Sequence, residues 1–183
     1  MNLTEPHTEP FASIAGLAST LQRAPGPLNL WLEFERALGT AFGHRLFTVL
    51  FFDAEKSRLQ RVHSNQPDVS PVGGAKAVTE SDWTRHVLRE GRIYVGSNAA
   101  DIRAAFSEHA LLASIGCDSV VNIPVRKSGV TVGTLNLLAA AGHYDSFSEP
   151  AALVFAQLAA DPLAECLANA RADPADDAAL EYV

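Results

Sequence analysis

The sequence predicts a mixed α/β domain of the α+β type, in which helices precede and follow strands that pair antiparallel. Three observations predict it. Apolar residues keep helical spacing near both ends of the chain, runs rich in β-forming residues occupy its middle, and two of these runs, residues 118–126 and 130–138, are separated only by a short polar turn. A turn this short joins neighbouring antiparallel strands, so we expect a central hairpin.

The length and composition fit one globular domain. The chain has 183 residues, of which 48% are hydrophobic and 19% charged, so it can bury a substantial core and does not belong to the disordered class. Its formal net charge is −7, from 14 lysines and arginines against 21 acidic residues, and the basic residues are scattered singly. Without a basic patch to neutralise phosphates, we expect no direct binding of nucleic acid.

Nothing in the sequence predicts secretion or membrane insertion. No apolar run approaches the ~20 residues that span a bilayer. Residues 1–10 contain two glutamates, no lysine or arginine and no apolar stretch, unlike a secretory signal. We therefore expect a cytoplasmic protein with no membrane partner. Cys117 and Cys166 lie in different predicted environments, which argues against a disulfide, and no Cys/His cluster has the spacing of a metal site.

The other elements follow from the same spacing rules. The expected helices cover residues 11–21, 28–42, 79–90, 98–106 and 107–114, and a long C-terminal stretch that begins at Ser148. The expected strands besides the hairpin cover residues 46–52, 58–64 and 93–95. Pro162 should kink the C-terminal helix, because proline removes one helical hydrogen bond.

The register of the hairpin decides which side chains share a face. A turn of two or four residues here would pair Val125 with Val130 and put Ser119 opposite Asn136, so that Ser119, Thr134 and Asn136 lie on one face; a three-residue turn would reverse this assignment. Both faces are mainly apolar, so we expect both to be covered, and a buried polar side chain must then find a partner. Backbone or water is the simpler partner for any single residue, but three polar residues on one face favour a pocket for a small ligand.

The order of elements and the hairpin motif resemble those of the GAF domain family. The matching motif comprises residues 116–119, Ile123-Pro124, Gly129 and residues 133–135. The resemblance covers residues 28–171, which leaves residues 1–27 as an N-terminal extension with a short helix and residues 172–183 as a flexible acidic tail. It implies a sandwich in which the N- and C-terminal helices cover one face of a central antiparallel sheet, while pocket-forming helices and loops cover the other.

The resemblance also implies where a ligand would bind. Five residues fall where similar domains line their pocket: Trp83, His86, Tyr94, Asp101 and His109. Among them, Trp83 could stack on a planar ligand and Asp101 could accept hydrogen bonds from amino groups. Trp83 is equally explained as a core anchor, and His109 as a partly exposed helix residue. The complete set of expected ligand-binding residues is Trp83, Tyr94, Asp101, His109, Ser119, Thr134 and Asn136. No metal ligand or catalytic residue is expected, and the sequence does not name a cofactor.

The predicted function is that of a regulatory domain that binds a small molecule and has no catalytic activity of its own. One alternative is a dimerising interaction module with a vestigial pocket, because the terminal helices of similar domains pack as a dimer-forming bundle; a homodimer is expected.

Another alternative is a thiol-based enzyme similar to the free methionine sulfoxide reductases, in which Cys117 would be the nucleophile. Val120, Asn136 and Leu138 stand where that family has acidic residues, which argues against this reaction. Asp118 follows Cys117 where similar photoreceptors have histidine, which argues against covalent attachment of a bilin.

Overall fold

The structure, a computed structural model, describes residues 10–23, 27–172 and 181–182. Its middle layer is a sheet in the order β4-β5-β6-β1-β2-β3-β7, in which the first six strands pair antiparallel and β7 pairs parallel with β3. The strands are β1 (Leu46–Asp53), β2 (Arg58–Ser64), β3 (Ala75–Ala77), β4 (Tyr94–Gly96), β5 (Ser119–Lys127), β6 (Val130–Ala139) and β7 (Glu181–Tyr182). The predicted central hairpin is β5 and β6, and the predicted mixed α/β class is confirmed.

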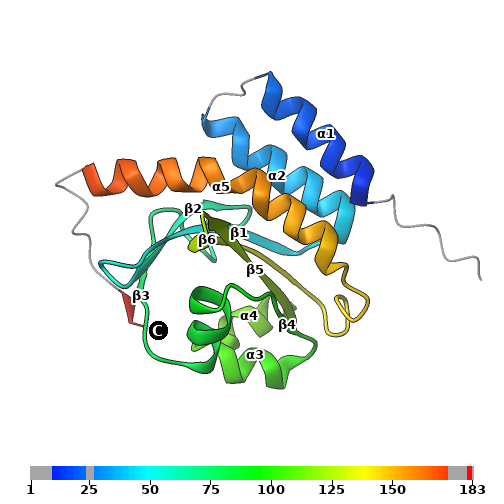
Figure 1. The fold of residues 1–183 in the computed structure, drawn as a ribbon. Helices are drawn as coiled ribbons and strands as arrows, with labels where there is room; N and C mark the ends of the chain where they lie inside the picture. The colour runs from blue at the N-terminus through cyan, green and yellow to red at the C-terminus, as the bar shows by residue number, and fades with distance from the viewer. Residues whose placement is uncertain (1–9, 24–26, 173–180, 183) are drawn as a thin grey trace, which may run out of the picture.

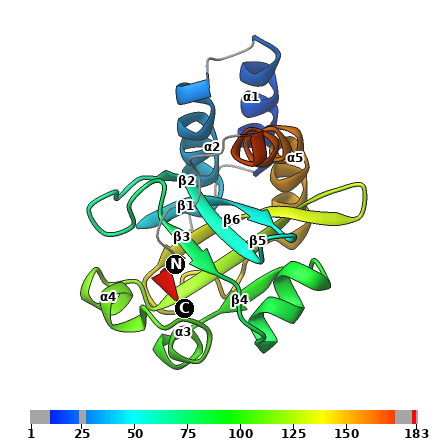
Figure 2. The same cartoon turned by 90° about the vertical axis from the view of Figure 1, so that its left-hand side faces the viewer.

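Three helices cover one face of the sheet and form the main core with it. They are α1 (Pro10–Gln22), α2 (Pro27–Phe42) and α5 (Glu149–Ala172). Figures 1 and 2 show this helical layer on one side of the sheet. Helix α2 buries Phe34 and Leu38 completely, and α5 buries Phe155 and Leu163. These side chains meet the odd-numbered residues of β1 and β5, because successive side chains of a strand point to opposite faces.

A smaller helical layer covers part of the opposite face. It consists of η1 (Thr84–Arg89), α3 (Ala99–Ala105) and α4 (His109–Ser114). The segment expected as an α-helix over residues 79–90 is a short π-helix, η1, preceded by one helical turn in which the Ser81 hydroxyl accepts a hydrogen bond from the Thr84 backbone nitrogen. Figure 2 shows α3 and α4 across the sheet from α1, α2 and α5. The two layers confirm the predicted sandwich.

Helix α5 bends midway along its length (Figure 1), as expected of a helix with Pro162 in its interior. Its end is anchored to the turn after β1, where the Arg171 guanidinium donates to Asp53 at 2.7 Å and to Glu55 at 2.9 Å. Burial acts to raise the pKa of the Asp53 carboxyl, but the guanidinium and the backbone N–H groups of Lys56 and Glu55 outweigh it and hold this pKa below its usual value. The carboxylate therefore stays charged while almost wholly buried.

Among the described residues, α5 is the one helix long and apolar enough to cross a membrane by length and composition, with a mean hydropathy of 1.4 over its most apolar window. Its position explains this composition in another way. Phe155 and Leu163 are fully buried against the sheet, together with a row of alanines on the same side of the helix. One face of α5 is therefore part of the main core.

The predicted register of the hairpin is wrong, because its turn lies at Ser128-Gly129 and because a bulge exchanges the two faces. Ser128 and Gly129 both have positive φ (51° and 81°) and form a two-residue turn that pairs Lys127 with Val130. One step further, Arg126 pairs with Thr131 but Val125 pairs with Gly133, so Val132 is an extra residue in β6. Because side chains alternate between the two faces, this one extra residue reverses which β5 residues share a face with a given β6 residue. Asn122, not Ser119, therefore shares its face with Thr134 and Asn136.

The division of the chain into an extension, a domain and a tail stays a prediction. Helix α1 of the expected extension packs against both α2 and α5. Residues 1–9, at the start of this extension, lie outside the described residues. Of the expected acidic tail, residues 173–180 and 183 also lie outside them, and residues 181–182 pair with β3.

Candidate ligand-binding site

A cavity of about 370 Å³ lies between the sheet and the smaller helical layer. Its floor is the sheet face formed by even-numbered residues of β1, β5 and β6, and its roof comes from the segment before η1 and from α3 and α4. Apolar side chains make up much of the wall, including Leu46, Leu50, Leu112 and Leu138. The volume falls in the range of small-molecule sites, and the mix of apolar wall and few polar groups is typical of them.

Five polar side chains, four of them buried, form a connected chain across the floor. Trp83 Nε1 donates to Asn122 Oδ1 at 3.0 Å, and Asn122 Nδ2 donates to Asn136 Oδ1 at 2.7 Å. Asn136 Nδ2 then donates to the hydroxyls of Thr134 and Thr48, at 3.1 and 3.3 Å. The Asn and Thr members are all less than one-tenth exposed. The hydrogen bonds thus connect the polar groups of the floor and give each of them at least one partner.

Each member of this chain occupies its place because of the strand pairing. Asn122 is directly opposite Asn136 in the β5–β6 pair, and Asn136 is directly opposite Thr48 in the β6–β1 pair. Trp83 lies just before η1, where its indole reaches the floor while the ring packs edge-on against Phe106 at 6.1 Å. The row formed by Asn122, Asn136 and Thr48 thus crosses β5, β6 and β1, and Trp83 connects it to the helical roof.

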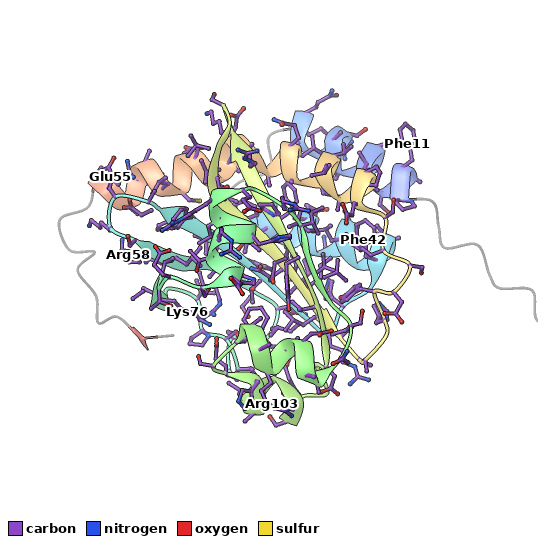
Figure 3. All side chains as sticks on the ribbon, turned by 60° about the horizontal axis from the view of Figure 1, so that its bottom comes forward. Phe11, Phe42, Glu55, Arg58, Lys76 and Arg103 are labelled. Carbon is purple, nitrogen blue, oxygen red and sulfur yellow. The ribbon has the colours of Figure 1, made fainter. Side chains whose placement is uncertain are left out.

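Charged side chains border the cavity. Arg61 of β2 lines it and is buried, and one of its guanidinium nitrogens donates to the Pro71 carbonyl oxygen at 2.9 Å. Lys76 of β3 forms an ion pair with Glu108, which precedes α4. Arg103 of α3 is exposed, and Figure 3 labels Lys76 and Arg103 on these two elements. Cations therefore come from both the sheet and the roof.

The structure brings four of the seven predicted residues to this cavity. Trp83, His109, Thr134 and Asn136 line it. The other three lie outside its lining and have partners within the protein. Their ligand contact stays a prediction without support from this geometry.

Tyr94 donates from its hydroxyl to the Asp101 carbonyl oxygen at 3.3 Å, and the Asp101 carboxylate accepts from the Ser97 backbone nitrogen at 2.8 Å. Burial, with a smaller contribution from the Asp101 charge, raises the pKa of the Tyr94 hydroxyl. Ser119 lies on the opposite face of β5 and donates to the Ala140 carbonyl oxygen at 2.7 Å. These contacts stabilise the ends of α3 and of the hairpin.

Sequence reasoning missed Asn122, Arg61 and Lys76. Asn122 was assigned to the other face through the register error. Arg61 lies in the strand predicted over residues 58–64, to which the sequence assigns no site residue, and Lys76 lies outside the predicted helices and strands. The Ser-Gly pair at residues 128–129 was a signal for the two-residue turn, but nothing in the sequence marks the bulge at Val132.

Neither cysteine is placed for thiol chemistry. Cys117 is fully buried in the cluster with Leu46 and Ile102, and burial raises the pKa of its thiol. Cys166 is half-buried on α5, and burial raises its pKa too. A nucleophilic thiol needs the opposite change and access to its substrate. The described part of the chain also holds no group of three His, Cys, Asp or Glu side chains that could bind a metal ion.

Comparison with solved structures identifies the fold. The GAF domain of a phosphoenolpyruvate-protein phosphotransferase from Acinetobacter aligns over 86% of this chain and 94% of its own, with a TM-score of 0.66 and 14% identity. The A. aeolicus NLH2 GAF domain in an inactive state aligns over 86% and 96%, with a TM-score of 0.66 and 13% identity. This chain has the GAF fold.

A GAF-containing structure with a known class of ligand is also similar. The chromophore-binding domain of a bacteriophytochrome from R. palustris aligns over 93% of this chain and 64% of its own, with a TM-score of 0.64 and 12% identity. No known protein family matches the sequence itself, and no curated protein does. At these identities the likeness concerns the GAF fold alone.

Proposed function

We propose that this GAF domain is a sensor that binds a small molecule in the cavity beneath η1, α3 and α4 and has no catalytic activity of its own. The observation that carries the proposal is the hydrogen-bonded polar chain on the floor of an otherwise largely apolar cavity. A core that only had to be filled would need no such chain there, because burying polar groups has a desolvation cost. The likeness to a chromophore-binding domain supports the same use of this fold.

The expected consequence is that the ligand regulates a partner from within the cytoplasm. Ligand-binding energy would be transmitted through the sheet, since the floor residues lie on strands whose other face carries α2 and α5. Helix α5 packs directly on β5, the strand that holds Asn122. A change at the floor thus has a short path to the helical layer.

Thermal unfolding against a panel of metabolites tests the sensor function. A ligand present at about one hundred times its Kd should raise the melting temperature by about 5–10 °C in a protein of this size. Ala105→Trp, which fills the cavity from α3, should abolish the shift. Ala110→Trp is the matched control, because Ala110 belongs to the same helical layer but is exposed and outside the lining. If no compound gives a shift that depends on Ala105, the cavity is not a binding site.

A second candidate function is dimerisation through the outer helical layer. Helices α1 and α5 lie side by side, and they expose Phe11 (74%), Leu153 (51%) and Val154 (44%). Figure 3 labels Phe11 at the start of α1. We propose that a second copy of this chain covers these side chains, because such exposed apolar groups gain stability when buried.

Analytical ultracentrifugation tests this second function. Phe11→Glu should shift the protein towards monomer, whereas Val72→Glu should not, because Val72 is a similarly exposed apolar residue in the loop before β3. A wild-type protein that sediments as a monomer at all concentrations would exclude a homodimer and leave the sensor function untouched.

A further inference from the structure

The hydrogen bonds on the cavity floor have a fixed direction, and Trp83 sets it. An indole N–H can only donate, so Asn122 must present its oxygen to Trp83. Its amide nitrogen then faces Asn136, which must present its oxygen in turn. The Asn136 nitrogen is therefore left to face the two threonine hydroxyls. The single donor on Trp83 therefore fixes the positions of the oxygen and the nitrogen in the amides of both Asn122 and Asn136.

Because of this direction, the polar groups of the floor keep hydrogens that they can still donate. Thr48 and Thr134 accept from Asn136 through their oxygens, so each keeps a hydroxyl hydrogen to donate. Asn122 uses one of its two amide hydrogens on Asn136 and keeps the other. In the described part of the chain, none of these three hydrogens has a protein acceptor. A ligand that accepts several hydrogen bonds at one end would satisfy those of the two threonines, which both contact the same Asn136 nitrogen.

A buried cation lies in the same row of the sheet as one of these donors, Thr134. Leu50 of β1 pairs with Thr134 on one side and with Arg61 on the other, and all three line the cavity. Neighbouring strands are about 4.8 Å apart, so the threonine and the arginine flank a space above Leu50 that is two strand spacings wide. Arg61 is only 8% exposed. An acceptor group above Leu50 would lie between a hydroxyl donor and a guanidinium.

The charges around the cavity agree with this arrangement. Among the described residues that line it, the lysines and arginines are Arg61, Lys76 and Arg103, and the one acidic residue is Glu108. The chain as a whole has the opposite balance, a net charge of −7. Cations therefore outnumber anions among the described lining residues, which favours an anionic ligand over a cationic one.

We propose, building on the sensor function, that the cavity recognises a small organic oxyanion, with its carboxylate or phosphate oxygens over Leu50 and its apolar body against the leucine wall. The oxygens accept from the hydroxyls of Thr134 and Thr48, and they face the buried Arg61 guanidinium. An oxyanion has acceptors only, so every contact with this floor is favourable. A primary amide of the same shape turns N–H groups towards donors and loses the charge, and so binds at least about tenfold more weakly.

Isothermal titration calorimetry with matched pairs tests the oxyanion site. The probes are carboxylates from butyrate to naphthoate, each paired with its own primary amide, and phenyl phosphate as the phosphate arm. We expect at least one acid to bind with a Kd below about 1 mM and its amide to bind at least about tenfold more weakly. Whether carboxylates or phenyl phosphate bind more tightly identifies the headgroup.

Valine substitutions then locate the headgroup. Thr134→Val keeps the shape and removes one donor, so it should weaken binding of the acid by about tenfold and leave the amide little changed. Thr131→Val is the matched control: Thr131 is on the same strand and buried, but its hydroxyl has no hydrogen-bond partner and lies outside the cavity lining. It should not change binding. Equal loss in both variants would contradict the proposed contact.

A reversal of the chain gives an independent test. In Asn122→Asp, the carboxylate still accepts from Trp83 but cannot donate to Asn136, so the Asn136 amide turns over and consumes the threonine hydrogens. Oxyanion binding should then be lost, while circular dichroism and the melting temperature confirm a folded protein. Retention of oxyanion binding by this variant would overturn the mechanism.

The outcomes separate this inference from the sensor function on which it rests. If neutral compounds from the metabolite panel bind, and their binding is blocked by Ala105→Trp, but no acid is preferred over its amide, the sensor function stands and the oxyanion inference fails. If no compound of either set binds, both fail.

Discussion

Removing the amide of Asn122 should lower the free energy of unfolding by about 2–4 kcal/mol, because two hydrogen bonds end on it. In Asn122→Ala, the Asn136 oxygen loses its donor at a position where the residue is 7% exposed, and the half-buried indole of Trp83 loses its acceptor. Each orphaned group costs about 1–3 kcal/mol. The indole should lie at the lower end of this range, since it borders the cavity and water can reach it.

Urea denaturation followed by circular dichroism measures the change, and a double-mutant cycle assigns it. Trp83→Phe removes the donor that starts the chain, so the combined variant should be less destabilised than the sum of the two by about 1 kcal/mol. Thr131→Val serves as the reference for a buried polar group with no hydrogen bond to lose, and should be neutral or stabilising. A cost below about 0.5 kcal/mol for Asn122→Ala, or strict additivity in the cycle, would refute the existence of a coupled chain.

Three further predictions concern the fold. Gly133→Ala should cost more than about 2 kcal/mol in urea unfolding, because its Cβ would lie 2.2 Å from a backbone carbonyl oxygen of β1, whereas Gly16→Ala, with nothing within 4 Å, should stabilise α1 by up to about 1 kcal/mol. Arg171→Met should cost about 1–3 kcal/mol at neutral pH. Since the pKa of Asp53 is lower in the folded than in the unfolded state, this difference should persist above pH 4 or so and vanish as the pH falls through the folded value, and a constant difference would contradict the ion pair. Cys117 should resist iodoacetamide in the native protein, as measured by mass spectrometry, and react once unfolded; rapid native labelling would contradict its burial.

The fold was largely predictable because its helices and strands are encoded locally. The spacing of Trp31, Phe34 and Leu38 predicts the buried face of α2, and the run at residues 46–52 predicts β1 as a strand covered on both faces. The bend of α5 follows from one proline. Each of these features depends on residues within a few turns of one another, so neighbours in the sequence are sufficient to predict them.

The site was less predictable because it depends on relations between strands. Thr134 and Asn136 were assigned to the cavity face correctly, but Asn122 joins them only through a bulge that no residue type marks. Arg61 reaches the cavity through a second irregularity, between Val49 and Leu50 in the β1–β2 pair. Two single-residue shifts therefore decide which polar side chains meet, and a pattern of alternating residues cannot reveal them.

The bulge at Val132 also affects how this protein should be compared with its relatives. An alignment that places the gap for the extra residue in the turn, and not at Val132, would shift part of β6 by one position. Residues of the cavity floor would then be aligned with residues of the main core. Substitutions at Thr134 or Asn136 in a relative would then be counted as changes in packing. Aligning the strands from Asn122 and Asn136 outward, with the extra residue at Val132, keeps the comparison on the positions that face the cavity.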